Sequence, residues 1–260
     1  MANLRDRRSV VGALRQASRY PQRAKWYLHR LRRDARLRLS HRDHLAYYGA
    51  VVDDLVVTGK ATAVGDDLTA RSRRVGKLQF DYLRQHGLEP HHRLLEIGCG
   101  NLRAGWRLIR YLEPGHYYGV DISQQVLFAA QQTVARRGLT DKLPYLLLVR
   151  DQTFTVLPDA SFDVIHAHSV FSHAPLDVIE DCFAHVGRLM KPDGFFDFTF
   201  KRTEGKEYGK LREDFYFRKE TLIDAADRHG LSAQFMDDWE ALGHSQSKIR
   251  ITLPQEKSKT

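Results

Sequence analysis

The chain is 260 residues long, which suits one sizeable α/β domain with an extra segment and is short for two ordinary domains. Hydrophobic residues make up 42% of it and charged residues 28%, so the composition excludes a disordered or fibrous protein. Two cysteines, Cys99 and Cys182, are too few for a disulfide framework or a structural zinc site, and we therefore expect a reducing, cytoplasmic location.

Positive charge gathers at the start of the chain. The formal net charge is +9, and residues 1–42 hold 13 of the 41 Lys and Arg but only 2 of the 32 acids, which leaves the rest nearly neutral. After Pro21, apolar residues recur at helical spacing with arginines between them, which predicts a basic amphipathic helix. These apolar residues are Ala24, Leu28, Leu31 and Ala35.

The use of this basic arm stays open between four alternatives. It could lie on an anionic membrane surface, grip a phosphorylated substrate or contact an RNA backbone. Alternatively, its apolar stripe packs on the rest of the protein and its arginines form a solvated face. Peripheral contact of residues 1–42 with an anionic membrane is thus one expectation, with nucleic acid a weaker one.

The start of the chain does not match an export signal. Arg7 and Arg8 resemble a twin-arginine pair, but arginines at 15, 19 and 23 interrupt the apolar region that should follow. No run approaches the roughly 20 apolar residues that a spanning helix needs. We therefore expect a protein that is neither exported nor membrane-spanning.

Residues 43–70 are predicted to be a linker or a cap over the active site, since short apolar stretches alternate there with glycines. A helical pattern then begins at Asp67 and ends at Gly87, where a glycine cap and Pro90 stop it. We therefore divide the chain into a basic helical arm and cap over 1–70 and an α/β domain over 71–260.

Strands and helices alternate through the α/β domain, which predicts a parallel sheet covered by helices on both faces. The predicted strands cover residues 93–97, 117–121, 145–149, 162–167 and 195–200. The polar stretch 201–211 is predicted to be an active-site loop. The predicted elements after it are a helix over 218–228 and a closing pair of strands over 232–236 and 249–253.

A glycine turn follows the first strand. Gly98 and Gly100 allow a ligand to approach the backbone at the carboxyl end of that strand. The dinucleotide fingerprint needs a third glycine at position 103, which is Arg103, so a tight pyrophosphate-binding turn is disfavoured. Glu96 instead precedes the glycines, giving the pattern acid-x-Gly-x-Gly.

This pattern resembles the first motif of the class I S-adenosylmethionine-dependent methyltransferases, which cradles the methionine part of the cofactor. The resemblance covers about residues 75–200 and implies a Rossmann-like three-layer sandwich with a mostly parallel seven-stranded sheet and an antiparallel last strand. It also implies S-adenosyl-L-methionine as cofactor. The residues that we expect to hold it are Glu96, Gly98, Cys99, Gly100, Asn101, Asp121, Ile122, Asp151, Gln152 and His168.

Two acids follow later strands. Asp121 ends the second strand, where an acid can accept both ribose hydroxyls; the alternative is that it only caps the helix after Ser123. Asp151 follows the third strand, and the resemblance implies that it reaches the adenine amino group. Its alternative role is that of a turn former.

Three histidines lie near the end of the fourth strand or after it, at positions 166, 168 and 173. The run over 169–173 is similar to an S-V-F-x-H segment of small-molecule methyltransferases, which lines the cofactor and opens toward the substrate. His173 is our candidate general base, because imidazole titrates near neutral pH. Alternatives are a structural histidine at a helix start, or no dedicated base at all, since methyl transfer depends largely on alignment. Because no carboxylate accompanies the histidines at ligand spacing, we expect no metal.

The prediction is therefore an S-adenosylmethionine-dependent methyltransferase acting on a small-molecule or lipid-linked acceptor, with a sugar hydroxyl as one candidate for O-methylation. An RNA methyltransferase that binds phosphates through the basic arm is the rival enzyme, although no N-P-P-Y motif is present. A cofactor-binding partner protein without catalysis is the alternative from another class. The acceptor and the oligomeric state stay open.

Overall fold

The computed structural model describes residues 21–57 and 69–254. The chain separates into two compact units, Met1–Arg42 and Asp43–Thr260. Our predicted boundary at residue 70 differs from this division, because the helix α3 (His44–Val57) belongs to the unit that contains the sheet. The reason is that α3 contacts the segments that follow the strands of the sheet.

The first unit contains the predicted basic helix, α2 (Pro21–Ser40). Within it, Arg38 Nε lies 2.9 Å from Asp34 Oδ2 across one helical turn, a pair that gives an exposed helix modest support. Among the described residues, no helix has both the length and the apolar composition that a membrane span requires.

The second unit is built on one sheet with the order β3-β2-β1-β4-β5-β9-β8. The first five of these strands are parallel, and β9 runs antiparallel to both of its neighbours. This is the predicted Rossmann-like arrangement. The strands are β1 (Leu94–Ile97), β2 (Tyr117–Asp121), β3 (Tyr145–Leu148), β4 (Phe162–Ala167), β5 (Met190–Arg202), β8 (Ser232–Phe235) and β9 (Ser247–Thr252).

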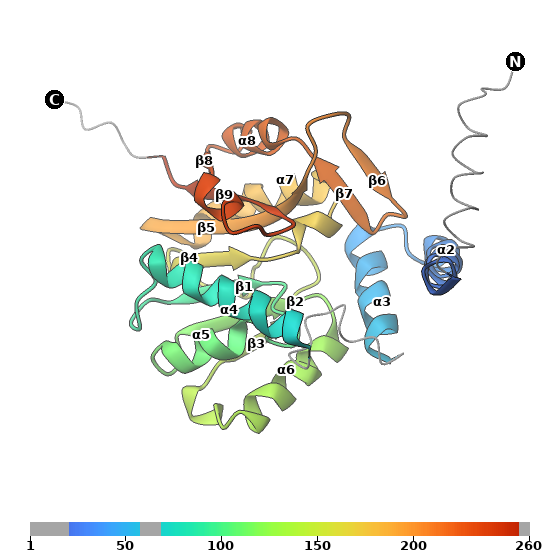
Figure 1. The fold of residues 1–260 in the computed structure, drawn as a ribbon. Helices are drawn as coiled ribbons and strands as arrows, with labels where there is room; N and C mark the ends of the chain where they lie inside the picture. Colours follow the sequence, from blue (N-terminus) through green and yellow to red (C-terminus); the bar gives the residue numbers. More distant parts are fainter. Residues whose placement is uncertain (1–20, 58–68, 255–260) are drawn as a thin grey trace, which may run out of the picture. The chain divides into compact units, whose positions relative to one another are not determined.

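Helices cover both faces of the sheet (Figure 1). One apolar cluster packs α4, α5 and α6 on the sheet, with Leu83, Leu108 and Ala130 at its centre. Another packs α7 and α8, with Phe183 and Leu222 buried. The bounds are α4 (Ala70–Gln85), α5 (Gly105–Tyr111), α6 (Gln124–Arg136), α7 (Leu176–Val186), α8 (Lys219–Arg228) and α9 (Asp237–Glu240), with 3-10 turns at Thr140–Lys142, Phe171–His173 and Gly187–Leu189.

Central strands form where apolar residues are continuous rather than alternating, because both faces of a parallel sheet are covered. All four residues of β1 are buried, and so are five of the six residues of β4. Burial of β1 includes Glu96, a carboxyl group inside the protein. The loops after β1, β2 and β4 leave the same edge of the sheet, where ligands of open α/β sheets bind.

One prediction about the later part of the domain is wrong. Residues 201–211 are not simply a loop: β5 continues to Arg202, and β6 (Tyr208–Lys210) pairs with β7 (Asp214–Phe217) in a hairpin. β7 also pairs with the end of β5, Lys201 opposite Tyr216. The polar sequence hid this hairpin, since its strands are short and mostly outside the core.

Candidate active site

A pocket lies at the carboxyl ends of β1, β2, β3 and β4, and α3 forms another of its walls. Nine of the eleven predicted site residues line it, so the sequence located the pocket from the strand ends. They are Glu96, Gly98, Cys99, Gly100, Asp121, Ile122, Gln152, His168 and His173. The structure does not bring the side chains of Asn101 and Asp151 into this lining.

The glycine turn closely approaches the segment that follows β4. Gly98 has a φ of 67°, and a Cβ there would lie 2.5 Å from Val170 Cγ2. Its N–H donates to Val120 O at 2.8 Å, and the Cys99 N–H donates to the same oxygen at 3.1 Å. A side chain at position 98 would therefore both strain the backbone and displace the loop after β4.

Asp121 ends β2 and holds two loops by backbone hydrogen bonds. Its Oδ2 accepts the Gly100 N–H and its Oδ1 accepts the Ser123 N–H, each at 3.0 Å. Burial raises the pKa of Asp121 to about 6, against these hydrogen bonds, which lower it. The N-cap of α6 is Ser123, whose Oγ accepts the Val126 N–H at 3.1 Å, so helix capping does not account for Asp121.

Glu96 is a buried carboxyl group under the influence of the Arg103 guanidinium. The Tyr117 hydroxyl donates to Glu96 Oε2 at 2.5 Å. A Cβ at Gly105 would lie within 3 Å of the Tyr117 hydroxyl oxygen and of Glu96 Oε2. Burial raises the pKa of Glu96 to about 7, and the positive charge of Arg103 opposes this rise. Burial lowers the pKa of Arg103. The sequence indicated Arg103 only as the residue that breaks the dinucleotide fingerprint, because its proximity to Glu96 arises in the fold.

Three buried polar atoms, each in a residue that lines the pocket, have no hydrogen-bond partner among the described residues. They are Arg103 Nε, Gln152 Oε1 and His168 Nδ1. Gln152 and His168 are 5% and 7% exposed, so solvent does not readily compensate their polar atoms. An unsatisfied buried polar group costs about 1–3 kcal/mol, which a ligand with matching polar groups would recover. The pocket is therefore built for a polar ligand.

Asp151 serves its local turn instead. Its side chain is exposed, and Oδ1 accepts the Thr153 N–H at 2.9 Å and the Thr153 hydroxyl at 2.5 Å. These hydrogen bonds lower the pKa of Asp151. The predicted contact with adenine has no support in this geometry, since the residue that lines the pocket here is Gln152.

The three histidines occupy different environments. His166 is buried, its Nε2 lies 3.2 Å from Gln79 Oε1, and burial lowers its pKa to about 3. Burial also lowers the pKa of His168 well below its usual range. His173 lies elsewhere in the lining, where its ring stacks on Tyr48 with centroids 5.2 Å apart. The pocket therefore contacts two of the histidines in chemically distinct places.

The helix α3 forms the wall beside His173. His44, Leu45, Tyr48 and Val52 line the pocket from this helix. His44 Nε2 donates to the His173 carbonyl oxygen at 2.8 Å. α3 thus places part of the segment predicted to be a linker or a cap against the pocket, and residues 58–68 of that segment lie outside the described residues.

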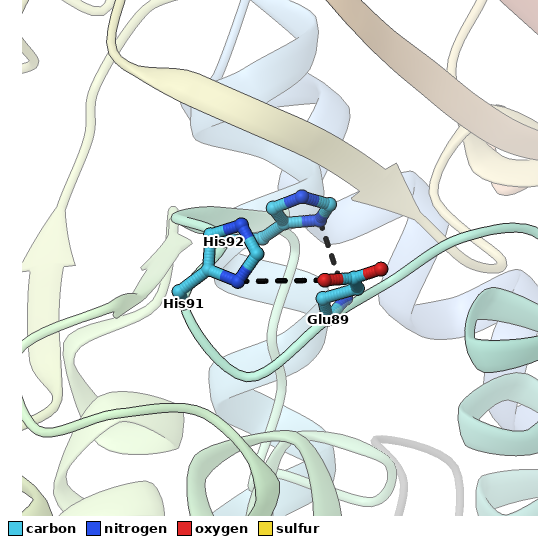
Figure 2. A group of neighbouring side chains, drawn as sticks. All are labelled: Glu89, His91 and His92. Carbon is cyan, nitrogen blue, oxygen red and sulfur yellow. Dashed lines mark hydrogen bonds and ion pairs between the residues drawn. The ribbon is translucent and has the colours of Figure 1, made fainter.

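A separate group of potential metal ligands lies in the turn between α4 and β1 (Figure 2). Glu89, His91 and His92 place their ligand atoms within 4.8 Å of one another. His92 Nδ1 already accepts the Glu89 N–H at 3.2 Å, and His91 Nδ1 lies 3.5 Å from Glu89 Oε2. None of the three residues lines the pocket.

Residues 95–196 match a family model described as a methyltransferase domain. The chain is 26% identical to a geranyl diphosphate 2-C-methyltransferase of Saccharopolyspora erythraea over 144 residues, 54% of this chain and 47% of that protein. It is 28% identical to a 24-methylenesterol C-methyltransferase 2 of Oryza sativa subsp. japonica over 110 residues, 42% of this chain and 28% of that protein. The match thus spans about half or less of these relatives.

Solved structures share the fold. Magnesium protoporphyrin IX methyltransferase from Synechocystis PCC 6803, with S-adenosylmethionine bound, has a TM-score of 0.59 at 16% identity, over 82% of this chain and 98% of that one. A [4+2]-cyclase has a TM-score of 0.57 at 17% identity, over 73% and 85% of the two chains. The fold therefore does not by itself determine the reaction. Residues 95–196 thus resemble a methyltransferase domain, the fold is shared with these solved structures, and the acid-x-Gly-x-Gly turn lies within the matched residues.

Proposed function

We propose that this protein binds S-adenosylmethionine in the pocket beside α3 and methylates a small-molecule acceptor there. The observation that carries the proposal is that three residues with unpartnered buried polar atoms line one pocket at the ends of β1, β2, β3 and β4. In open α/β sheets this edge binds nucleotide-like ligands. The acid-x-Gly-x-Gly turn and an acid suited to ribose lie at this same edge.

The residues fit the three chemical parts of the cofactor. Asp121 keeps acceptor capacity for ribose hydroxyls, because a carboxylate oxygen that accepts one backbone N–H retains a further lone pair. Gln152 Oε1 would accept from the adenine amino group. Arg103 and His168 would hold the amino-acid end, whose carboxylate suits a guanidinium. The sequence prediction that assigned the adenine to Asp151 is thus replaced by an assignment to its neighbour.

Electrostatics favour a zwitterionic ligand at the Glu96 end. Burial shifts the pKa of both Glu96 and Arg103 against the charged form. A ligand that brings an ammonium and a carboxylate would stabilise both charges. When bound, S-adenosylmethionine supplies an electrophilic methyl group on a sulfonium. The residues of this chain then align the acceptor and accept its proton.

The acceptor wall is aromatic and apolar. It comprises His44, Leu45, Tyr48, Val52, Ala174 and Val178, together with His173. Such a wall suits a small molecule with an apolar part. The relatives named for geranyl diphosphate, a sterol and a porphyrin support the same class of acceptor. We extend the proposal to a lipid-linked acceptor, with a sugar hydroxyl as one candidate group. The basic residues 1–42 support this extension, because they suit an anionic membrane surface.

The test is transfer of a labelled methyl group. Purified protein is incubated with methyl-labelled S-adenosylmethionine and with separated lipid, small-molecule and RNA fractions of a cell extract. Label is expected in the lipid or small-molecule fraction, and Asp121→Ala should reduce it at a limiting concentration of S-adenosylmethionine. Label confined to the RNA fraction would show that the acceptor is RNA and not a small molecule. No transfer to any fraction would favour a cofactor-binding protein without catalysis.

A further inference from the structure

The β6–β7 hairpin contacts His173 directly. The hairpin follows β5 and lies beside α3 (Figure 1), where the Tyr47 hydroxyl donates to Leu211 O at 3.1 Å. At the start of β7, Glu213 O lies 2.5 Å from His173 Nδ1, and Asp214 Oδ1 lies 3.5 Å from the same nitrogen. A hairpin whose strands were not predicted from the sequence therefore contacts the candidate base.

This contact selects one tautomer of His173. A carbonyl oxygen only accepts hydrogen bonds, so His173 Nδ1 must donate to Glu213 O. In the neutral ring the proton therefore sits on Nδ1, and Nε2 is the nitrogen that can accept a proton. Stacking on Tyr48, with 19° between the ring planes, restrains the ring orientation further.

Asp214 is placed to stabilise the ring once it is protonated. Its side chain is 13% exposed, lies beside His173 and forms an ion pair with the Lys201 ammonium. A nearby carboxylate favours an imidazolium, and in serine hydrolases a buried aspartate has this role without taking the proton itself. The distance of 3.5 Å is suited to an ion pair that forms only when the ring gains its second proton.

We propose that Asp214 is a positioning residue and that the β6–β7 hairpin prepares His173 Nε2 to accept a proton from the methyl acceptor. This inference rests on the proposed function and narrows the acceptor to molecules that lose a proton, from a hydroxyl or an N–H group. As the acceptor atom bonds to the methyl carbon, the carbon–sulfur bond breaks and leaves its electron pair on sulfur. The released proton moves to Nε2, and the positive charge passes from sulfonium to imidazolium.

Other charged and titratable groups surround the ring. From α3, His44 donates to the His173 carbonyl oxygen, and burial lowers the pKa of His44. Arg212, from the hairpin, and Asp177, from α7, act electrostatically on His44 with opposite signs. The carboxylate of Asp214 faces the His173 ring itself, and Lys201 pairs with that carboxylate.

Nitrogen NMR on the full-length protein labelled with ¹⁵N-histidine tests the tautomer. His173→Gln identifies the His173 signals, and the spectra are recorded with S-adenosylhomocysteine present and absent. Neutral His173 should carry its proton on Nδ1. A neutral ring protonated on Nε2 would overturn the proposal.

Two variants then test the charge of Asp214. Asp214→Asn should lower the pH at which half of His173 is doubly protonated by roughly one unit, as expected for loss of an opposite charge at this distance. Lys201→Met is the matched control and should raise this midpoint, because it removes the cation and keeps the carboxylate. A merely structural role would not give shifts of opposite sign. Unchanged midpoints in both variants would contradict the proposal.

The outcome is separable from that of the proposed function. The tautomer and the midpoint are properties of the protein alone and are measurable whether or not S-adenosylhomocysteine binds. If calorimetry shows no binding of S-adenosylhomocysteine while the midpoints move as expected, the hairpin prepares His173 for a different reaction. If binding is normal and the midpoints do not move, the cofactor assignment stands and Asp214 has no role.

Discussion

The carboxylate of Asp121, at the end of β2, accepts the backbone N–H of Gly100 at 3.0 Å. The acid that we assign to the ribose therefore also holds the glycine turn after β1 in place. This bond joins two neighbouring strand ends whose loops line the same pocket. In the proposed function, recognition of the cofactor and the geometry of the turn depend on the same side chain.

Asp121→Ala should weaken S-adenosylhomocysteine binding by more than about tenfold, since an acceptor of paired hydrogen bonds is lost. Isothermal titration calorimetry measures this. Asp181→Ala, at a half-exposed acid on α7, is the control and should leave the affinity unchanged. An Asp121 variant that is folded and binds as tightly as the wild type would remove this residue from the site.

Arg103→Met should weaken binding of S-adenosylhomocysteine by about tenfold or more, because a charged hydrogen bond to the carboxylate contributes about 1.5–3 kcal/mol. Binding of 5′-methylthioadenosine, which lacks the amino-acid end, should not change. Competition between the two ligands in wild type and variant provides the comparison. Equal losses for both ligands would show that Arg103 acts on the shape of the pocket rather than on the carboxylate.

Glu96 makes stability depend on pH. Because burial raises its pKa from an ordinary value of 4.5 to about 7, the folded protein binds more protons than the unfolded chain between these values. The contribution of Glu96 to the free energy of unfolding must therefore fall as pH rises from about 4.5 to 7. Relative to Glu96→Gln, the wild type should lose stability over this range in urea unfolding. A constant difference between the two proteins would mean that the pKa of Glu96 is not shifted.

Deletion of residues 1–40 should leave S-adenosylhomocysteine affinity within about twofold of the wild type. The reason is that the described residues lining the pocket all belong to the unit Asp43–Thr260. If the basic arm contacts membranes, the deletion should also reduce the fraction of the protein that sediments with vesicles containing anionic lipid. Loss of cofactor binding would instead make the arm part of the catalytic fold.

Much of the fold could be predicted because its strands are short apolar runs that end in glycines or acids. The β1 turn, Asp121 and the antiparallel last strand follow from such patterns or from the family resemblance. Arg103 was missed because its role depends on an electrostatic pairing with Glu96 inside the fold that no linear pattern displays. Gln152 was predicted beside Asp151, but only the local turn at Thr153 decides which of the two side chains faces the pocket.

The β6–β7 hairpin could not be predicted for a different reason. Its three-residue and four-residue strands carry little alternation, and their register depends on distant partners. The end of β5 supplies one of these partners, since Lys201 pairs with Asp214 and lies over the Tyr216 ring. Tertiary contacts of this kind determine the position of His173 as well.

Calorimetric titration of the purified full chain with S-adenosylhomocysteine tests the central claim most directly. We predict one binding site per chain, and no comparable heat with a nicotinamide dinucleotide, because Arg103 stands where a pyrophosphate turn requires glycine. Tight binding of the nicotinamide nucleotide, with no heat from S-adenosylhomocysteine, would contradict the account.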